Sequence, residues 1–158
     1  MKIKKFNGFD QNGYLPYGMY NMTFEEFKNI FGKCSMKRKE ILKEYKKFMV
    51  EIKNTGYLLN HWIGGSFVTK KENPNDIDTL IEFDGKKVDE NKDKLRIDYL
   101  VYNSRSKSNG LCHPWRVYSY PQYDKEKYNA YLIVKSRIII ELFSSDKKDI
   151  PKGIVCLR

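Results

Sequence analysis

Two apolar segments, residues 57–63 and 77–83, flank a polar loop and constrain the fold more than any other part of the chain. Both segments are rich in β-branched, aromatic and leucine residues, which predicts a strand on each side of the loop. The first segment runs into the turn Gly64-Gly65-Ser66, and the second begins beside Asp76 and Asp78. Strand residues at i and i+2 share a face, so the two carboxylates are expected side by side at one end of a sheet.

This arrangement suggests a definite chemistry. Two carboxylates held close together repel each other unless a cation lies between them. A nearby Gly-Ser turn offers backbone N–H groups and a hydroxyl, which are groups that bind phosphate. The stretch therefore predicts a metal and phosphate site. The structural alternative is an ordinary turn in a β-containing protein, with Asp76 closing the loop after Pro74.

The segments before this stretch are predicted to be mostly helical. Residues 1–22 form an irregular, aromatic-rich arm with glycines and a proline. The sequence Thr23-Phe-Glu-Glu26 fits a capping box and predicts a short helix up to Gly32. A longer helix is expected after Ser35, to about Asn54, because apolar residues recur there at the spacing of one helical face.

The segments after it are predicted to be mixed. Residues 95–102 fit a third strand, with a helix as the alternative, and residues 103–114 fit a surface loop. A further strand at 116–120 and a helix at 124–137 follow. The apolar runs 138–143 and 153–157 are expected to pair as a hairpin. This order of elements predicts one α+β domain over residues 1–158, with a mixed sheet packed by the N-terminal helices.

The composition of the chain indicates which partners it favours and in which compartment it is expected. The chain of 158 residues is 41% apolar and carries a net charge of +10, which favours anionic partners such as nucleotides or nucleic acid. The basic side of helix 36–53 is the candidate nucleic-acid surface. No window approaches the ~18 apolar residues of a membrane span. With three scattered cysteines expected to be reduced, a cytoplasmic protein with no membrane association is predicted.

The turn, the loop and the Asp-x-Asp pattern together resemble the polymerase-β-type nucleotidyltransferase superfamily. More narrowly, and over nearly the whole chain, the sequence resembles the uncharacterised DUF6932-type nucleotidyltransferase-like proteins of bacteria and phages. The segments that carry this likeness are Leu15-Pro-Tyr-Gly18, Thr23-Phe-Glu-Glu-Phe27, Trp62-Ile-Gly-Gly-Ser-Phe-Val-Thr69, Asn73-Pro-Asn-Asp-Ile-Asp78 and Pro151-Lys-Gly-Ile-Val155. The resemblance implies a nucleotidyltransferase-like fold.

The resemblance also implies roles for individual residues. The turn Gly64-Gly65-Ser66 would hold the phosphates of an NTP, and Asp76 and Asp78 would bind Mg²⁺. A third carboxylate on a neighbouring strand would complete the site, and Asp98 is the candidate if its segment is a strand. If the neighbouring strand is 116–120 instead, no acid is present there. Lys70, in the loop, is the candidate contact to the triphosphate, with a solvated lysine as the alternative.

Three functions remain open at this point. The first is binding of NTP and Mg²⁺ with transfer of a nucleotidyl group to a hydroxyl acceptor. The second is a catalytically inert protein-binding module of a phage or mobile element, with an antitoxin-like, anti-defence or regulatory role on the same fold. The third is a nucleic-acid-binding domain led by helix 36–53.

Overall fold

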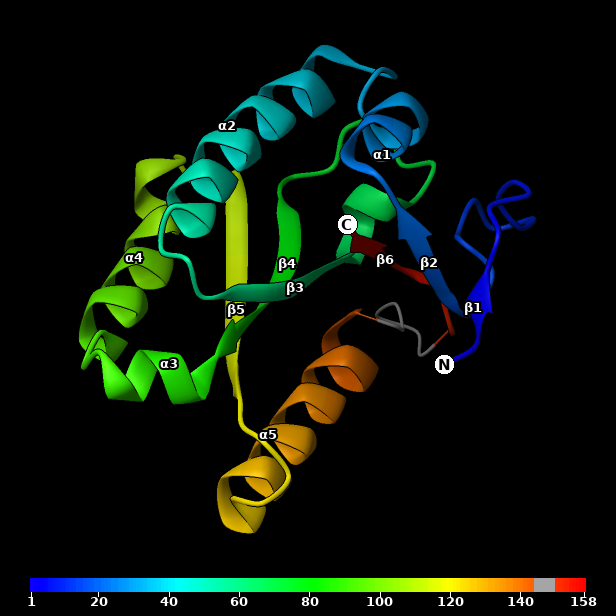
Figure 1. The fold of residues 1–158 in the computed structure, drawn as a ribbon. Helices are drawn as coiled ribbons and strands as arrows, with labels where there is room; N and C mark the ends of the chain where they lie inside the picture. The colour runs from blue at the N-terminus through cyan, green and yellow to red at the C-terminus, as the bar shows by residue number, and fades with distance from the viewer. Residues whose placement is uncertain (144–149) are drawn as a thin grey trace.

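The computed structural model describes residues 1–143 and 150–158, which form a six-stranded mixed sheet with helices on both faces (Figure 1). The strand order is β1-β2-β6-β3-β4-β5. β3 is antiparallel to both of its neighbours, whereas β4 pairs with β5 in parallel. The predicted α+β class is confirmed. The strands are β1 (Ile3–Lys4), β2 (Met19–Met22), β3 (Leu58–Gly64), β4 (Ile77–Asp84), β5 (Cys112–Ser119) and β6 (Ile154–Leu157).

The first two helices begin where the sequence predicts caps, after Thr23 and Ser35. The Thr23 hydroxyl accepts from the backbone N–H of Glu26, and the Glu26 carboxylate accepts from the backbone N–H of Thr23 at 2.7 Å, so the capping box is confirmed. Among the described residues, no helix combines the length and apolar character that crossing a bilayer requires. The helices are α1 (Phe24–Phe31), α2 (Met36–Lys53), α3 (Gly85–Glu90), α4 (Lys94–Lys107) and α5 (Lys125–Arg137). A 3-10 turn (Gly65–Val68) lies between β3 and β4, and a π-helical turn (Ile138–Phe143) follows α5.

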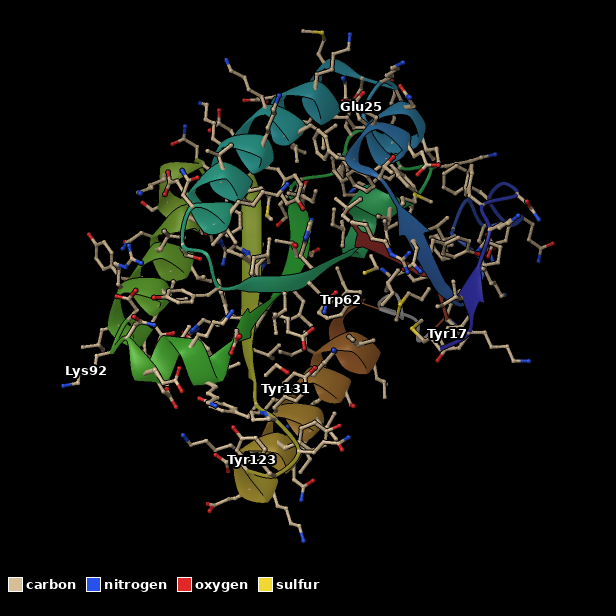
Figure 2. All side chains as sticks on the ribbon, in the orientation of Figure 1. Tyr17, Glu25, Trp62, Lys92, Tyr123 and Tyr131 are labelled. Atoms are coloured by element: carbon tan, nitrogen blue, oxygen red, sulfur yellow. The ribbon has the colours of Figure 1, made fainter. Side chains whose placement is uncertain are left out.

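The two faces of the sheet carry different helices. Helices α1, α2 and α4 pack on one face, around a core that includes Phe27, Ile41 and Ile81. Helix α5 packs on the other face, where Tyr131 meets Trp62 (Figure 2). Burial of these aromatic and aliphatic side chains is the main stabilising term for both layers. We call the two sides the α2 face and the α5 face.

Buried polar contacts also attach α5 to the sheet. Glu82 of β4 is 3% exposed and accepts hydrogen bonds from Tyr131 and from Asn60, the latter at 3.0 Å. Lys135 forms an ion pair with the same carboxylate at 3.2 Å, and its ammonium lies 4.3 Å from the centre of the Trp62 ring. A buried carboxylate with three partners is satisfied and fixes the position of the helix.

Three sequence predictions need correction or refinement. The expected arm, residues 1–22, contains strand β2, which pairs with β6 inside the sheet. Residues 95–102 take the helical alternative within α4. The strand predicted at 116–120 begins earlier, at Cys112, inside the segment expected to be a loop. Because β5 lies at the edge of the sheet, it tolerates Pro114, which lacks a backbone donor.

The predicted hairpin of 138–143 with 153–157 is wrong. Residues 138–143 continue α5 as a π-helical turn, and β6 pairs instead with β2 and β3. An apolar run of six residues fits a strand or a helix equally well, because its periodicity does not separate the two. Packing against the core around Trp62, where Ile138 and Ile139 lie, decides the outcome.

Candidate functional site

The structure brings Asp76, Asp78 and His113 together on the α5 face. Asp78 is the second residue of β4 and lies opposite His113 of β5 in the parallel ladder. One ligand atom from each of the three side chains lies within 4.8 Å of the others, a grouping that could hold a metal ion. All three residues are partly buried. The predicted side-by-side placement of the two carboxylates is therefore found, with a histidine as the third member.

The electrostatics of Asp78 reflect this crowding. Burial raises the pKa of the Asp78 carboxyl, and the neighbouring carboxylate of Asp76 raises it further. His113 and Lys152 act in the opposite direction without cancelling the effect. The ionised form of Asp78 is thus held at a cost, and a bound cation would lower that cost.

The glycine turn approaches the Asp78 carboxylate closely. Gly64 pairs with Asp78 at the end of the β3–β4 ladder, and Gly65 begins the 3-10 turn with a φ of +69°. A side chain at Gly65 would be strained by that φ and would collide with the Asp78 carboxylate. Ser66 follows, partly exposed, so the predicted turn residues border the carboxylate pair.

A buried lysine lies near the same carboxylates. Lys152 is 7% exposed and close enough to Asp78 to lower the pKa of its carboxyl. Its position is set by the segment Leu15–Gly18: the N–H of Gly153 donates to the carbonyl of Leu15 at 2.8 Å, and that of Ile154 to the carbonyl of Gly18 at 2.9 Å. The aromatic-rich arm thus holds a cation beside the acids.

The loop between the turn and β4 is fixed from the α2 face. Arg38 is 1% exposed, and its guanidinium donates five hydrogen bonds to four carbonyls. Three of these carbonyls, on Phe67, Thr69 and Lys71, belong to the turn or to the loop after it. Since a guanidinium has five N–H donors, all of them are used. Arg38 therefore lies on the buried side of helix 36–53, apart from the basic side that the sequence offers to nucleic acid.

Lys70 lies toward the N-terminal arm. Its ammonium is 5.7 Å from the centre of the Phe9 ring, and its backbone N–H donates to the carbonyl of Gly13 at 2.8 Å. The side chain is exposed. Lys70 is therefore close to the turn in sequence, but its side chain lies beside Phe9 of the N-terminal arm.

The structure does not bring Asp98 to Asp76 and Asp78. Asp98 lies on α4 and accepts hydrogen bonds from Arg116 and Tyr118. Partial burial raises the pKa of Asp98, but the bonds from Arg116 and Tyr118 outweigh this and lower it overall. Tyr118 packs against the core of the α2 face, so Asp98 lies across the sheet from the carboxylate pair. Glu141, a more distant candidate for the third acid, has a side chain outside the described part of the structure.

Sequence reasoning missed His113 and Lys152 as members of the site. His113 was placed in a loop, so its pairing with Asp78 was not expected; the strand signal was masked by Pro114. Lys152 lies in one of the segments that carry the family resemblance, which was the available signal. The neighbouring thiol of Cys112 is buried, which raises its pKa to about 12 and makes it a poor nucleophile.

Comparison with known proteins identifies the family. The sequence model of a family of unknown function, DUF6932, matches residues 7–158. The match covers the turn, the carboxylate pair, His113 and Lys152. The chain matches no curated protein and no solved structure. Because the family model spans far more than half of the sequence, the protein belongs to the DUF6932 family.

Proposed function

We propose that this protein binds a nucleoside triphosphate with a divalent cation and transfers a nucleotidyl group to a hydroxyl acceptor. The observation that carries the proposal is the meeting of Asp76 and Asp78 with the Gly64–Ser66 turn at one end of the sheet. The resemblance to the polymerase-β-type nucleotidyltransferases supports it, and implies Mg²⁺ as the cation. The site offers the two oxygen donors that Mg²⁺ needs from a protein, since Mg²⁺ keeps several waters.

Each part of the site has a role in this reaction. Asp76 and Asp78 would hold the cation, which would neutralise the charge that develops on the phosphates. The turn lets the backbone approach the phosphates closely, because Gly64 and Gly65 have no side chain. Lys152 adds a fixed positive charge on the same side.

The reaction is an exchange at the α-phosphorus. The acceptor oxygen forms a bond to phosphorus as the bond to the pyrophosphate oxygen breaks. The acceptor proton passes to one of the two carboxylates of the site. Asp98 takes no part in this scheme, because it lies on the α2 face.

Titration calorimetry tests the proposal. ATP, GTP, CTP and UTP should be titrated with and without divalent cation against the unmodified protein and against the Asp76→Ala, Asp78→Ala double variant. We expect cation-dependent binding of at least one nucleotide, with a loss of at least about tenfold in the double variant. Asp98→Asn is the matched control and should bind as the unmodified protein does.

The opposite result favours the inert protein-binding module. If no nucleotide binds with any cation, His113 and Lys152 act as internal partners of the carboxylates, and the site has no ligand. The 3.3 Å contact between His113 and Asp78 and the proximity of Lys152 to Asp78 are the observations that favour this alternative. A phage or regulatory partner would then bind another surface.

A nucleic-acid role has its own supporting feature. An open cavity of about 620 Å³ between α1 and α2 has an apolar floor that includes Phe24 and Leu42, and five lysines line it: Lys28, Lys33, Lys39, Lys43 and Lys46. Glu25 also lines it and forms an ion pair with Lys28 at 3.2 Å, so the other four lysines carry its net charge. Elsewhere on α2 the charge is partly balanced, because Lys37 and Lys47 form ion pairs with Glu40 and Glu44.

Salt dependence tests this role. If the lysine cavity binds nucleic acid, the affinity falls steeply as salt rises. The Lys39→Ala, Lys43→Ala double variant should bind more weakly and with a smaller salt slope. A flat salt response of the unmodified protein would exclude the role.

A further inference from the structure

The third position of the carboxylate site is held by an imidazole, and this bears on which cation the site takes. The inference rests on the proposed function, because it concerns the same site. We infer that His113 is a direct metal ligand, and that the site favours first-row transition cations of the Zn²⁺ and Co²⁺ type over Mg²⁺.

The position of His113 is set by the backbone. Eight consecutive residue pairs join β4 and β5 in parallel, and Asp78 pairs with His113 in that ladder. Residues paired in this way point to the same face, so the imidazole and the carboxylate project together on the α5 face. Trp115, two residues along β5, lies with its ring centroid 5.3 Å from that of His113 and restricts the imidazole. The histidine is thus a built part of the site.

The distance between the two side chains fits shared metal ligation. Nδ1 of His113 lies 3.3 Å from Oδ1 of Asp78. A charge-assisted hydrogen bond between such groups is normally shorter, about 2.7–2.9 Å. Two neighbouring ligands at about 2.1 Å from one ion lie about 3.0 Å apart in octahedral geometry and about 3.4 Å apart in tetrahedral geometry. The observed distance falls between these two values.

The donor chemistry then sets the preference. Mg²⁺ is a hard cation that takes oxygen ligands, whereas imidazole nitrogen suits Zn²⁺ and its neighbours in the first transition row. A third carboxylate would make an all-oxygen site, and Asp98, the acid expected in that place, lies on the α2 face. Asp76, Asp78 and His113 together provide two oxygens and one nitrogen.

Histidine NMR provides a test that does not depend on activity. The chain has two histidines, His61 and His113, so each serves as a reference for the other. His61 is 7% exposed and its side chain lies on the α2 face, beside Tyr45. On addition of one equivalent of Zn²⁺ to the protein labelled with ¹⁵N, we expect the Nδ1 resonance of His113 to shift and that of His61 to stay in place.

Comparison of cation affinities provides a second test of the ligand assignment. We expect Zn²⁺ and Co²⁺ to bind the unmodified protein more tightly than Mg²⁺ in titration calorimetry. Transition cations bind most sites more tightly than Mg²⁺, so the decisive quantity is the effect of His113 on the affinity ratio. The variant His113→Asp creates an all-oxygen site and should lower the ratio of Zn²⁺ affinity to Mg²⁺ affinity at least about tenfold. Circular dichroism of this variant checks that it remains folded.

The outcomes separate this inference from the proposed function. Zn²⁺ binding without a shift at His113, or an unchanged affinity ratio in His113→Asp, overturns the ligand assignment. If Mg²⁺ and nucleotide still bind through Asp76 and Asp78 in that case, the proposed function stands. If no divalent cation binds, both are overturned.

Discussion

Gly65 and Asp78 lie so close that a Cβ atom on residue 65 would collide with the Oδ2 atom of Asp78. The Gly65→Ala variant should therefore move the carboxylate as well as strain the backbone. A positive φ costs an L-residue about 1–2 kcal/mol, and the collision should add about 1–3 kcal/mol to the loss of unfolding free energy. Urea unfolding measures the loss, and calorimetry measures the accompanying fall in cation affinity.

Gly56→Ala is the matched control for this change. Gly56 has a φ of +74° and no atom within 4 Å of its would-be Cβ. The Gly56→Ala variant should lose only the free energy that a positive φ costs an L-residue, about 1–2 kcal/mol, and should bind cations unchanged. Equal losses of stability in the two variants would show that the carboxylate moves aside freely.

Asp78 should destabilise the protein in the absence of a cation. The pKa of its carboxyl is raised in the folded state by burial and by Asp76, so stability falls as the pH rises through that pKa. We expect Asp78→Asn to raise the unfolding free energy at neutral pH in EDTA by about 0.5–2 kcal/mol, as replacement of costly functional residues often does. Thermal unfolding in EDTA measures this. The same variant should lose the stabilisation that added Zn²⁺ gives the unmodified protein, and a lower melting temperature in EDTA would contradict the prediction.

Arg38 should be one of the most sensitive positions in the chain. In Arg38→Lys an ammonium replaces a guanidinium whose five donors are used, so at least two hydrogen bonds are lost. Three donors cannot satisfy four carbonyls, and each carbonyl left without a donor costs about 1–3 kcal/mol, which predicts a loss of at least about 1–3 kcal/mol. Urea unfolding measures the loss, and limited proteolysis should show faster cleavage within residues 66–76.

Arg96→Lys is the control for the chemical change itself. Arg96 is exposed and pairs with Asp93 at 2.9 Å, an arrangement that a lysine can replace. A change within about 0.5 kcal/mol is expected. If Arg38→Lys also stays within that range, the loop does not depend on the guanidinium.

His61 should make the protein sensitive to mild acid. Burial, and secondarily the charge of Lys53, lowers the pKa of the His61 imidazole to about 4. Between pH 6.5 and 4 the unfolded chain binds a proton there that the folded chain does not, so stability is complete above pH 6.5 and is lost as the pH falls. The contribution of this group is about 3 kcal/mol across that range. Comparing urea midpoints of the unmodified protein and His61→Gln at pH 7.5 and 5 isolates it, and parallel pH dependences would rule it out.

The stretch from Trp62 to Phe83 was predictable because local signals agree there. The glycines, the Asp-x-Asp spacing and the two apolar segments all indicate a strand, a turn and a second strand. The capping residues Thr23 and Ser35 likewise marked the first two helices correctly. In these places, local propensity and tertiary packing favour the same conformation.

Other segments were ambiguous because tertiary contacts decide them. In residues 95–102, Ile97 and Val101 are buried one helical turn apart, but the same residues also fit an alternating strand. Asp98 was the candidate third acid only if its segment formed a strand, and the segment takes the helical alternative on the other side of the sheet. His113 was hidden for the same kind of reason, because a strand that tolerates Pro114 is recognised only once it is known to lie at an edge.

The position of strand β6 within the sheet has a consequence for biosynthesis. The strand lies between β2 and β3, although it follows the other described strands in the sequence. Until residues 152–157 have left the ribosome, β2 and β3 have no shared neighbour, and both expose edges that can pair with other chains. Lys152 arrives with the same segment. The nascent chain therefore acquires a continuous sheet and the buried side chain of Lys152 together, once this segment has emerged.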